Sequence, residues 1–222
     1  RARPRGRAAP RRAERFAEPR RSVLSNGLRV LTVRAPGLHS AMIALYVRAG
    51  SRHEERGTNG VSHFLEHLFF RGSEGWPDTV AMNAAVEAAG GSLNGITARD
   101  HGCYYTPIHA GEMRTGLAVL GDLIRRPLLR EMDVEREVIL EEMLDEVDAE
   151  GRDIDPDNLS KRLAYGDHPL GFKIAGTPAI VRRLGEAGQG GLDVVEPVAG
   201  PEQLRLPEPG GGVAGVAAQR LG

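Results

Sequence analysis

Short β-branched runs and helical patterns alternate irregularly over residues 22–184, and this alternation limits the fold more than any other feature of the sequence. Glycine and proline separate the strand-like runs from the amphipathic stretches. Strands are predicted at 28–33, 42–47, 93–97 and 103–108, and helices at 60–70, 79–89, 111–124, 133–147 and 159–165. Because strands and helices do not follow a regular repeat, we expect an α+β fold in which helices pack on a mostly antiparallel sheet.

The two ends of the sequence differ in composition from this central domain. Residues 1–21 contain nine arginines and no apolar run. They predict a disordered basic leader, with an organellar transit peptide or a basic docking arm as alternatives. Residues 185–222 contain ten glycines, four prolines and no aromatic residue, which predicts an irregular tail, truncated or divergent.

The overall composition excludes several classes of protein. A net charge of −1 gives the chain no general attraction to nucleic acid or to an anionic membrane. The single cysteine, Cys103, excludes an internal disulfide framework. No apolar run reaches the length of a membrane helix. We therefore expect a soluble protein without nucleic-acid or membrane partners. The composition does not determine the compartment; of the possible ones, the bacterial cytoplasm is favoured over an organelle matrix.

The sequence His63-Phe64-Leu65-Glu66-His67 carries the clearest chemical signal. On a helix capped by Thr58 or Asn59, His63 and His67 lie one turn apart on one face, and Glu66 shares that face. Two neutral imidazoles can bind one zinc ion, and the glutamate beside them can act on water. The order H-x-x-E-H is the reverse of the commoner zinc-protease motif. The alternative is an amphipathic helix whose histidines are merely packed.

A catalytic zinc site needs a third protein ligand, and the acidic helix predicted at 133–147 offers several. Ten of residues 131–150 are Asp or Glu, and most of them are expected to face solvent. Glu135 and Glu142 are two turns apart on one face. The residue pattern alone leaves Glu141, Glu142 and Glu146 as candidates.

Several separate motifs resemble one known family. The chain is similar to the pitrilysin/insulinase family of inverted-motif zinc peptidases, and most similar to processing-peptidase β subunits and small bacterial homologues. The resemblance covers about residues 22–184. The motifs that carry it are Asn26-Gly27-Leu28-Arg29-Val30, Ala49-Gly50-Ser51-Arg52 with Glu54, His63 to His67, Phe70-Arg71-Gly72-Ser73, Gly90-Gly91 with Asn94, Glu135 to Glu142, Pro169-Leu170-Gly171 and Gly176-Thr177.

The resemblance implies roles for individual residues. In the family, the third ligand lies about seventy-five residues after the second histidine, which is Glu142 here, and Glu135 is the supporting acidic residue. Glu66 becomes the general base. Asn94 begins the strand that binds substrate backbone by strand addition, although an asparagine at this position could also simply form a turn. The family usually has alanine where this chain has Gly95.

The resemblance also implies an incomplete enzyme. Family members usually carry two related halves that close around the substrate, and this sequence matches the first half only. The expected function is a zinc-dependent metalloendopeptidase that acts on peptides or unfolded segments. The expected partner is a second peptidase half, a partner subunit or a second copy of the chain. The alternatives are a non-catalytic subunit of a related assembly and an inactive fragment.

Overall fold

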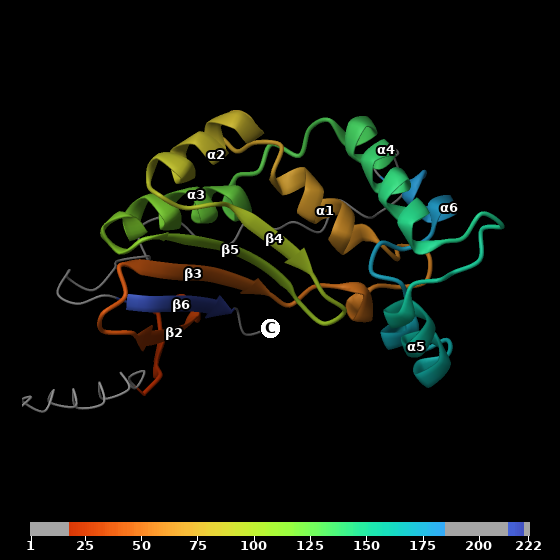
Figure 1. Cartoon of the computed structure of the whole chain (residues 1–222), viewed down its shortest axis with the longest axis horizontal. Helices are drawn as coiled ribbons and strands as arrows, with labels where there is room; N and C mark the ends of the chain where they lie inside the picture. Colours follow the sequence, from red (N-terminus) through yellow and green to blue (C-terminus); the bar gives the residue numbers. More distant parts are fainter. Residues whose placement is uncertain (1–17, 185–212, 220–222) are drawn as a thin grey trace, which may run out of the picture.

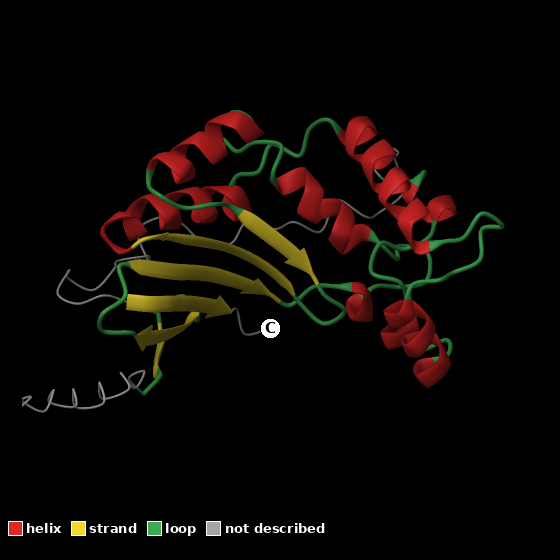
Figure 2. Ribbon diagram, in the orientation of Figure 1, coloured by secondary structure: helices red, strands yellow, loops and turns green. Residues whose placement is uncertain are grey.

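The computed structural model describes residues 18–184 and 213–219, which form a six-stranded sheet with helices packed against it (Figures 1 and 2). The strand order is β1-β2-β6-β3-β5-β4. Neighbouring strands are antiparallel except for β3 and β6, which are parallel. The strands are β1 (Arg20–Val23), β2 (Arg29–Arg34), β3 (Ser40–Val47), β4 (Asn94–Thr97), β5 (Gly102–His109) and β6 (Val213–Gln219). The expected α+β class with a mostly antiparallel sheet is confirmed.

The helices are divided between the sheet and a second group beside β4 (Figure 2). The α-helices are α1 (Val61–Phe69), α2 (Thr79–Ala88), α3 (Met113–Arg125), α4 (Met132–Glu142), α5 (Pro156–Tyr165) and α6 (Pro178–Val181). Short 3-10 turns occur at η1 (Ser51–His53), η2 (Ala110–Glu112), η3 (Met143–Glu146) and η4 (Pro169–Gly171). Within the described residues, no helix combines the length and apolar character needed to cross a bilayer.

Helix α1 lies between two hydrophobic clusters. Phe69 belongs to the cluster that packs α2 and α3 on β3 and β5. Phe64 and Leu68 are fully buried in the second cluster, where they meet Ile139 and Met143 from α4 and η3. Since each cluster takes a different face of α1, both the position and the rotation of this helix are fixed by packing.

The structure corrects the prediction for the tail. Residues 213–219 form β6, so the expectation of irregular chain is wrong for this stretch, and residues 185–212 and 220–222 lie outside the described residues. The strand has neighbours on both sides, since it pairs with β2 and with β3. Backbone pairing on two edges can hold a small-residue segment whose own strand preference is weak.

Two other boundaries differ from expectation. Strand β1 begins at Arg20, so the last two residues of the expected disordered leader are part of the sheet; residues 1–17 lie outside the described residues. The acidic helix expected to run to residue 147 ends at Glu142, where the chain tightens into η3. A tightening of the last turn is a common way for a helix to end.

Candidate active site

Helix α1 presents His63, Glu66 and His67, while its opposite faces are buried in the two clusters. The histidine rings lie edge to face, with their centroids 4.7 Å apart. Both side chains are mostly buried, with 18% and 17% of their surface exposed. Gly60, in the left-handed conformation, occupies the N-cap position, so the expectation that Thr58 or Asn59 caps this helix is wrong.

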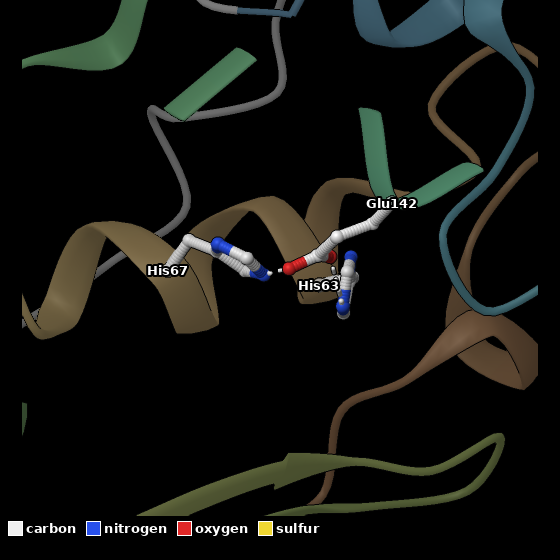
Figure 3. A group of neighbouring side chains, drawn as sticks. All are labelled: His63, His67 and Glu142. Atoms are coloured by element: carbon white, nitrogen blue, oxygen red, sulfur yellow. Dashed lines mark ion pairs between the residues drawn. The ribbon is translucent and has the colours of Figure 1, made fainter. Parts of the chain in front are cut away.

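Glu142 reaches the two histidines from the last residue of α4 (Figure 3). Its Oε2 lies 3.9 Å from Nε2 of His63 and 3.5 Å from Nε2 of His67. One donor atom from each of the three residues lies within 4.8 Å of the other two. Of the other candidates, Glu141 is not part of this group among the described residues, and Glu146 binds Nζ of Lys173 at 3.0 Å.

A second layer of charged residues holds His67. Its Nδ1 lies 2.8 Å from Oε2 of Glu135, a residue that is only 4% exposed. The Nε group of Arg71 donates to the other oxygen of Glu135, and Nη1 of Arg71 lies 3.0 Å from Oε2 of Glu131. Because a carboxylate can only accept, Nδ1 of His67 carries the proton, and Nε2 keeps its lone pair for a metal.

The donor atoms of this cluster fit a cation. Burial, with a smaller effect of His67, lowers the pKa of His63 to about 4, so this imidazole is neutral at neutral pH. The Nδ1 atom of His63 is buried and has no hydrogen-bond partner among the described residues. One imidazole nitrogen from each histidine and one carboxylate oxygen of Glu142 thus converge. Two histidines and one glutamate are a donor set of catalytic zinc sites, with one position left open.

Glu66 contacts β4. The hydroxyl group of Thr97 donates to Oε2 of Glu66. Burial is the main cause that raises the pKa of Glu66 above its ordinary value, and the Thr97 hydrogen bond partly opposes it. A carboxylate with a raised pKa is a stronger base, as a proton acceptor in catalysis requires.

Strand β4 comes close to Glu66 because it has a glycine at position 95. A methyl group built on Gly95 would lie 2.8 Å from Oε1 of Glu66 and 2.7 Å from Cε2 of Phe70. Asn94, at the start of β4, donates through Nδ2 to the backbone oxygen of Ser92 at 3.3 Å and to its hydroxyl at 3.1 Å. The predicted substrate-binding residue thus lies on the same edge strand as Thr97, with its amide turned toward Ser92.

Sequence reasoning missed two residues that hold this site. Arg71 lies just beyond the end of α1, and its place in the motif Phe70-Arg71-Gly72-Ser73 was the signal that could have found it. Thr97 has no comparable signal, because its contact with Glu66 depends on how β4 lies against α1.

Comparison with known proteins identifies the family. A model of the insulinase family, peptidase family M16, matches residues 29–178, which is more than half of the chain. The chain belongs to the M16 family. This confirms the resemblance drawn from the sequence motifs.

Individual M16 relatives agree with this. An uncharacterised zinc protease of Mycobacterium tuberculosis is 36% identical over 165 residues, which cover 72% of this chain and 36% of that protein. The mitochondrial-processing peptidase subunit beta of Blastocladiella emersonii is 34% identical over 166 residues, which cover 74% of this chain and 35% of that subunit. The chain therefore matches little more than a third of the length of these relatives.

Solved structures share the fold. The crystal structure of pitrilysin matches with a TM-score of 0.61 and 25% identity, over 74% of this chain and 18% of that chain. A protease from Helicobacter pylori matches with a TM-score of 0.64 and 24% identity, over 74% of this chain and 40% of that one. The arrangement of sheet and helices described above is thus an M16 arrangement.

Proposed function

We propose that this chain is the zinc-binding part of an M16 metalloendopeptidase that hydrolyses peptide bonds in peptides or unfolded segments. His63, His67 and Glu142 hold the zinc ion, Glu135 supports His67, and Glu66 is the general base. The observation that carries the proposal is that three donor atoms lie within 4.8 Å of one another. Glu66 lies on α1, the helix that supplies both histidines. The names of the M16 relatives, among them zinc proteases, support the choice of metal.

The chemistry divides between the metal and Glu66. Zinc at this position supplies a Lewis acid that makes water more acidic and the scissile carbonyl more electrophilic. Thr97 holds Oε2 of Glu66, which leaves Oε1 to take the proton of the attacking water. The same oxygen then gives the proton to the leaving nitrogen, so that Glu66 ends the cycle as it began.

The substrate binds in an extended form along β4. This strand is at the edge of the sheet, with β5 as its only neighbour in the described sheet. Main-chain groups on an open edge bind a peptide by strand addition with little dependence on its sequence. The side-chain amide of Asn94, once released from Ser92, binds the peptide as well. Because Thr97 lies on the same strand, a peptide bound there passes close to Glu66.

A partner completes the enzyme. The chain matches little more than a third of its relatives' length, and one relative is named as a subunit of a processing peptidase. We propose a second peptidase half, a partner subunit or a second copy of this chain as the group that holds the peptide in line. Orientation can account for about 7–11 kcal/mol of a catalysed barrier. The isolated chain should therefore cleave a quenched fluorogenic peptide feebly, and addition of a second-half polypeptide should raise the rate.

Zinc content tests the proposed site directly. The purified chain should bind one zinc ion per molecule, measured by atomic emission after dialysis against metal-free buffer. The His67→Ala variant should lose this stoichiometric zinc, because the two remaining ligands bind the ion too weakly to retain it through dialysis. His101→Ala is the matched control, since His101 lies beside Tyr46, pairs with Asp100 and is outside the proposed set of ligands. A full equivalent of zinc in His67→Ala would refute the assignment.

A further inference from the structure

The helix that carries both histidines begins without a cap at its own N-cap position. Gly60 occupies that position at φ 102° and has no side chain. The first N–H groups of a helix have no partner within the helix, so the first turn needs acceptors from elsewhere. His63 is the third residue of α1 and lies in this first turn, whereas His67 lies in the next. The distance between the two imidazoles therefore depends on whether the first turn is closed.

Glu54, from the loop before α1, supplies the missing acceptors. Its side chain is buried, with 7% of the residue exposed. Oε2 of Glu54 accepts a hydrogen bond from the N–H of Gly60 at 2.7 Å, and Oε1 accepts one from the N–H of Ser62 at 2.8 Å. A carboxylate at a helix N-terminus also interacts favourably with the helix dipole. One buried side chain thus satisfies two amides of the turn that contains His63.

The surrounding backbone explains why the cap cannot come from position 60 itself. A methyl group built on Gly60 would lie 2.5 Å from the backbone oxygen of Ala175, and one on Gly176 would lie 2.2 Å from the backbone oxygen of Asn59. A serine, threonine or aspartate would not fit at position 60. The cap must therefore reach this turn from another part of the chain.

Glu54 is itself held in place by Asn59. The Nδ2 group of Asn59 donates to Oε2 of Glu54 at 3.0 Å and to the backbone oxygen of Lys173 at 2.9 Å. Asn59 is buried, with 5% exposed. The carboxylate is consequently held by Asn59 as well as by the two backbone amides, and a single orientation serves all three donors.

We infer that Glu54 is a positioning residue of the zinc site: its carboxylate closes the first turn of α1 and so fixes His63 relative to His67. This inference rests on the proposed function, since it gives Glu54 a role at the proposed zinc site. It assigns a purpose to a glutamate that the sequence motif contains and that contacts neither the metal ligands nor Glu66. A protein that must first close this turn binds zinc more weakly, in proportion to the fraction of molecules with the turn closed.

The test compares two variants of the full chain by zinc titration against a competing chromophoric chelator, at a temperature where both are folded. Glu54→Gln keeps the size of the side chain, loses the charge and places an NH₂ group against an amide donor. Its zinc affinity should fall about tenfold if the turn is closed in about one molecule in ten. Asp78→Ala is the matched control, because Oδ1 of Asp78 caps α2 through the N–H of Ala81 at 2.7 Å, away from the histidines. Its affinity should stay at the wild-type value.

The outcomes separate the two proposals. A wild-type chain that binds no zinc would refute the proposed function, and with it any role of Glu54 there. If the wild-type chain binds zinc and folded Glu54→Gln binds it with the same affinity, the inference about Glu54 is wrong and the proposed function is unaffected. If Glu54→Gln does not fold, Glu54→Asp replaces it: the shorter side chain cannot reach both amides, and its affinity should also fall. In the wild-type chain the amide hydrogens of Gly60 and Ser62 should exchange slowly, and fast exchange at both would overturn the inference without any variant.

Discussion

Nδ1 of His67 lies 2.8 Å from Oε2 of Glu135, on the side of the imidazole ring away from Glu142. The contact connects the first turn of α4 to the last turn of α1, and the other end of α4 supplies Glu142 to the same ring. Helix α4 therefore contributes to the proposed site twice, first by orienting a histidine and then by adding a carboxylate. Since the two glutamates are seven residues apart, two helical turns separate these tasks.

Replacement of Glu135 should weaken metal binding, although Glu135 is not one of the proposed metal ligands. Glu135→Gln leaves His67 without a carboxylate partner, so the imidazole is a weaker ligand and is less firmly oriented. Zinc affinity should fall by about 10–100-fold. Glu137→Gln is the matched control, because Glu137 lies on the exposed part of the same helix. Equal affinities in the two variants would exclude a supporting role for Glu135.

The identity of the third ligand can be tested within α4. Glu142→Gln should weaken zinc binding far more than Glu141→Gln, because only Glu142 has an oxygen within 3.9 Å of both Nε2 atoms. Glu141 is rotated by about 100° around the helix axis. The measurement is competition for zinc with a chelator of known affinity. A larger loss in Glu141→Gln would shift the ligand by one residue.

Glu66 should be needed for hydrolysis and dispensable for the metal. Glu66→Gln keeps the shape of the side chain and its contact with Thr97, but an amide cannot take the proton from water. Zinc should bind as in the parent chain, while peptide cleavage falls by about 10²–10⁴-fold in whichever assembly is active. Parallel measurement of zinc content and cleavage rate checks this. Cleavage close to the parent rate would place Glu66 outside the reaction.

A methyl group at position 95, where the family usually has alanine, requires the ends of the Glu66 and Phe70 side chains to move. A methyl group at this position meets Oε1 of Glu66 and the Phe70 ring at less than 3.0 Å. We expect Gly95→Ala to lower the free energy of unfolding by about 1–3 kcal/mol, as overpacking does, and to reduce cleavage through displaced Glu66. Gly102→Ala in β5 is the control, since its methyl group would meet only Tyr104, at 3.7 Å. Thermal unfolding of both variants distinguishes local crowding from a general cost of replacing a strand glycine.

Much of the site could be predicted because it is local. The spacing of His63, Glu66 and His67 places them on one helix face, whatever the rest of the fold does. Glu142 was different, because residue pattern alone could not separate it from Glu141 and Glu146; only the spacing in the resembling family did so. The contact between Glu66 and Thr97 had no sequence signal at all, because it depends on the packing of an edge strand against α1.

The difference between local patterns and long-range packing also explains the errors in the predicted fold. Strands β3 and β5 are rich in apolar residues and were located to within a few residues. Strand β6 was missed, because a glycine- and alanine-rich segment becomes a strand only when β2 and β3 are already beside it. The N-cap of α1 was missed for a related reason, since Glu54 reaches the helix from outside the positions in which a cap is normally sought.

The position of β6 determines when the sheet can be completed during synthesis. Strands β2 and β3 follow one another in the sequence, yet β6 lies between them. Residue 47 ends β3 and residue 213 begins β6, so at about 5–20 residues per second the ribosome takes on the order of ten seconds or more to make the missing strand. For that interval the facing edges of β2 and β3 are open, and open edges pair readily with other chains. The nascent chain therefore has a defined period in which these two edges are exposed to pairing with other chains.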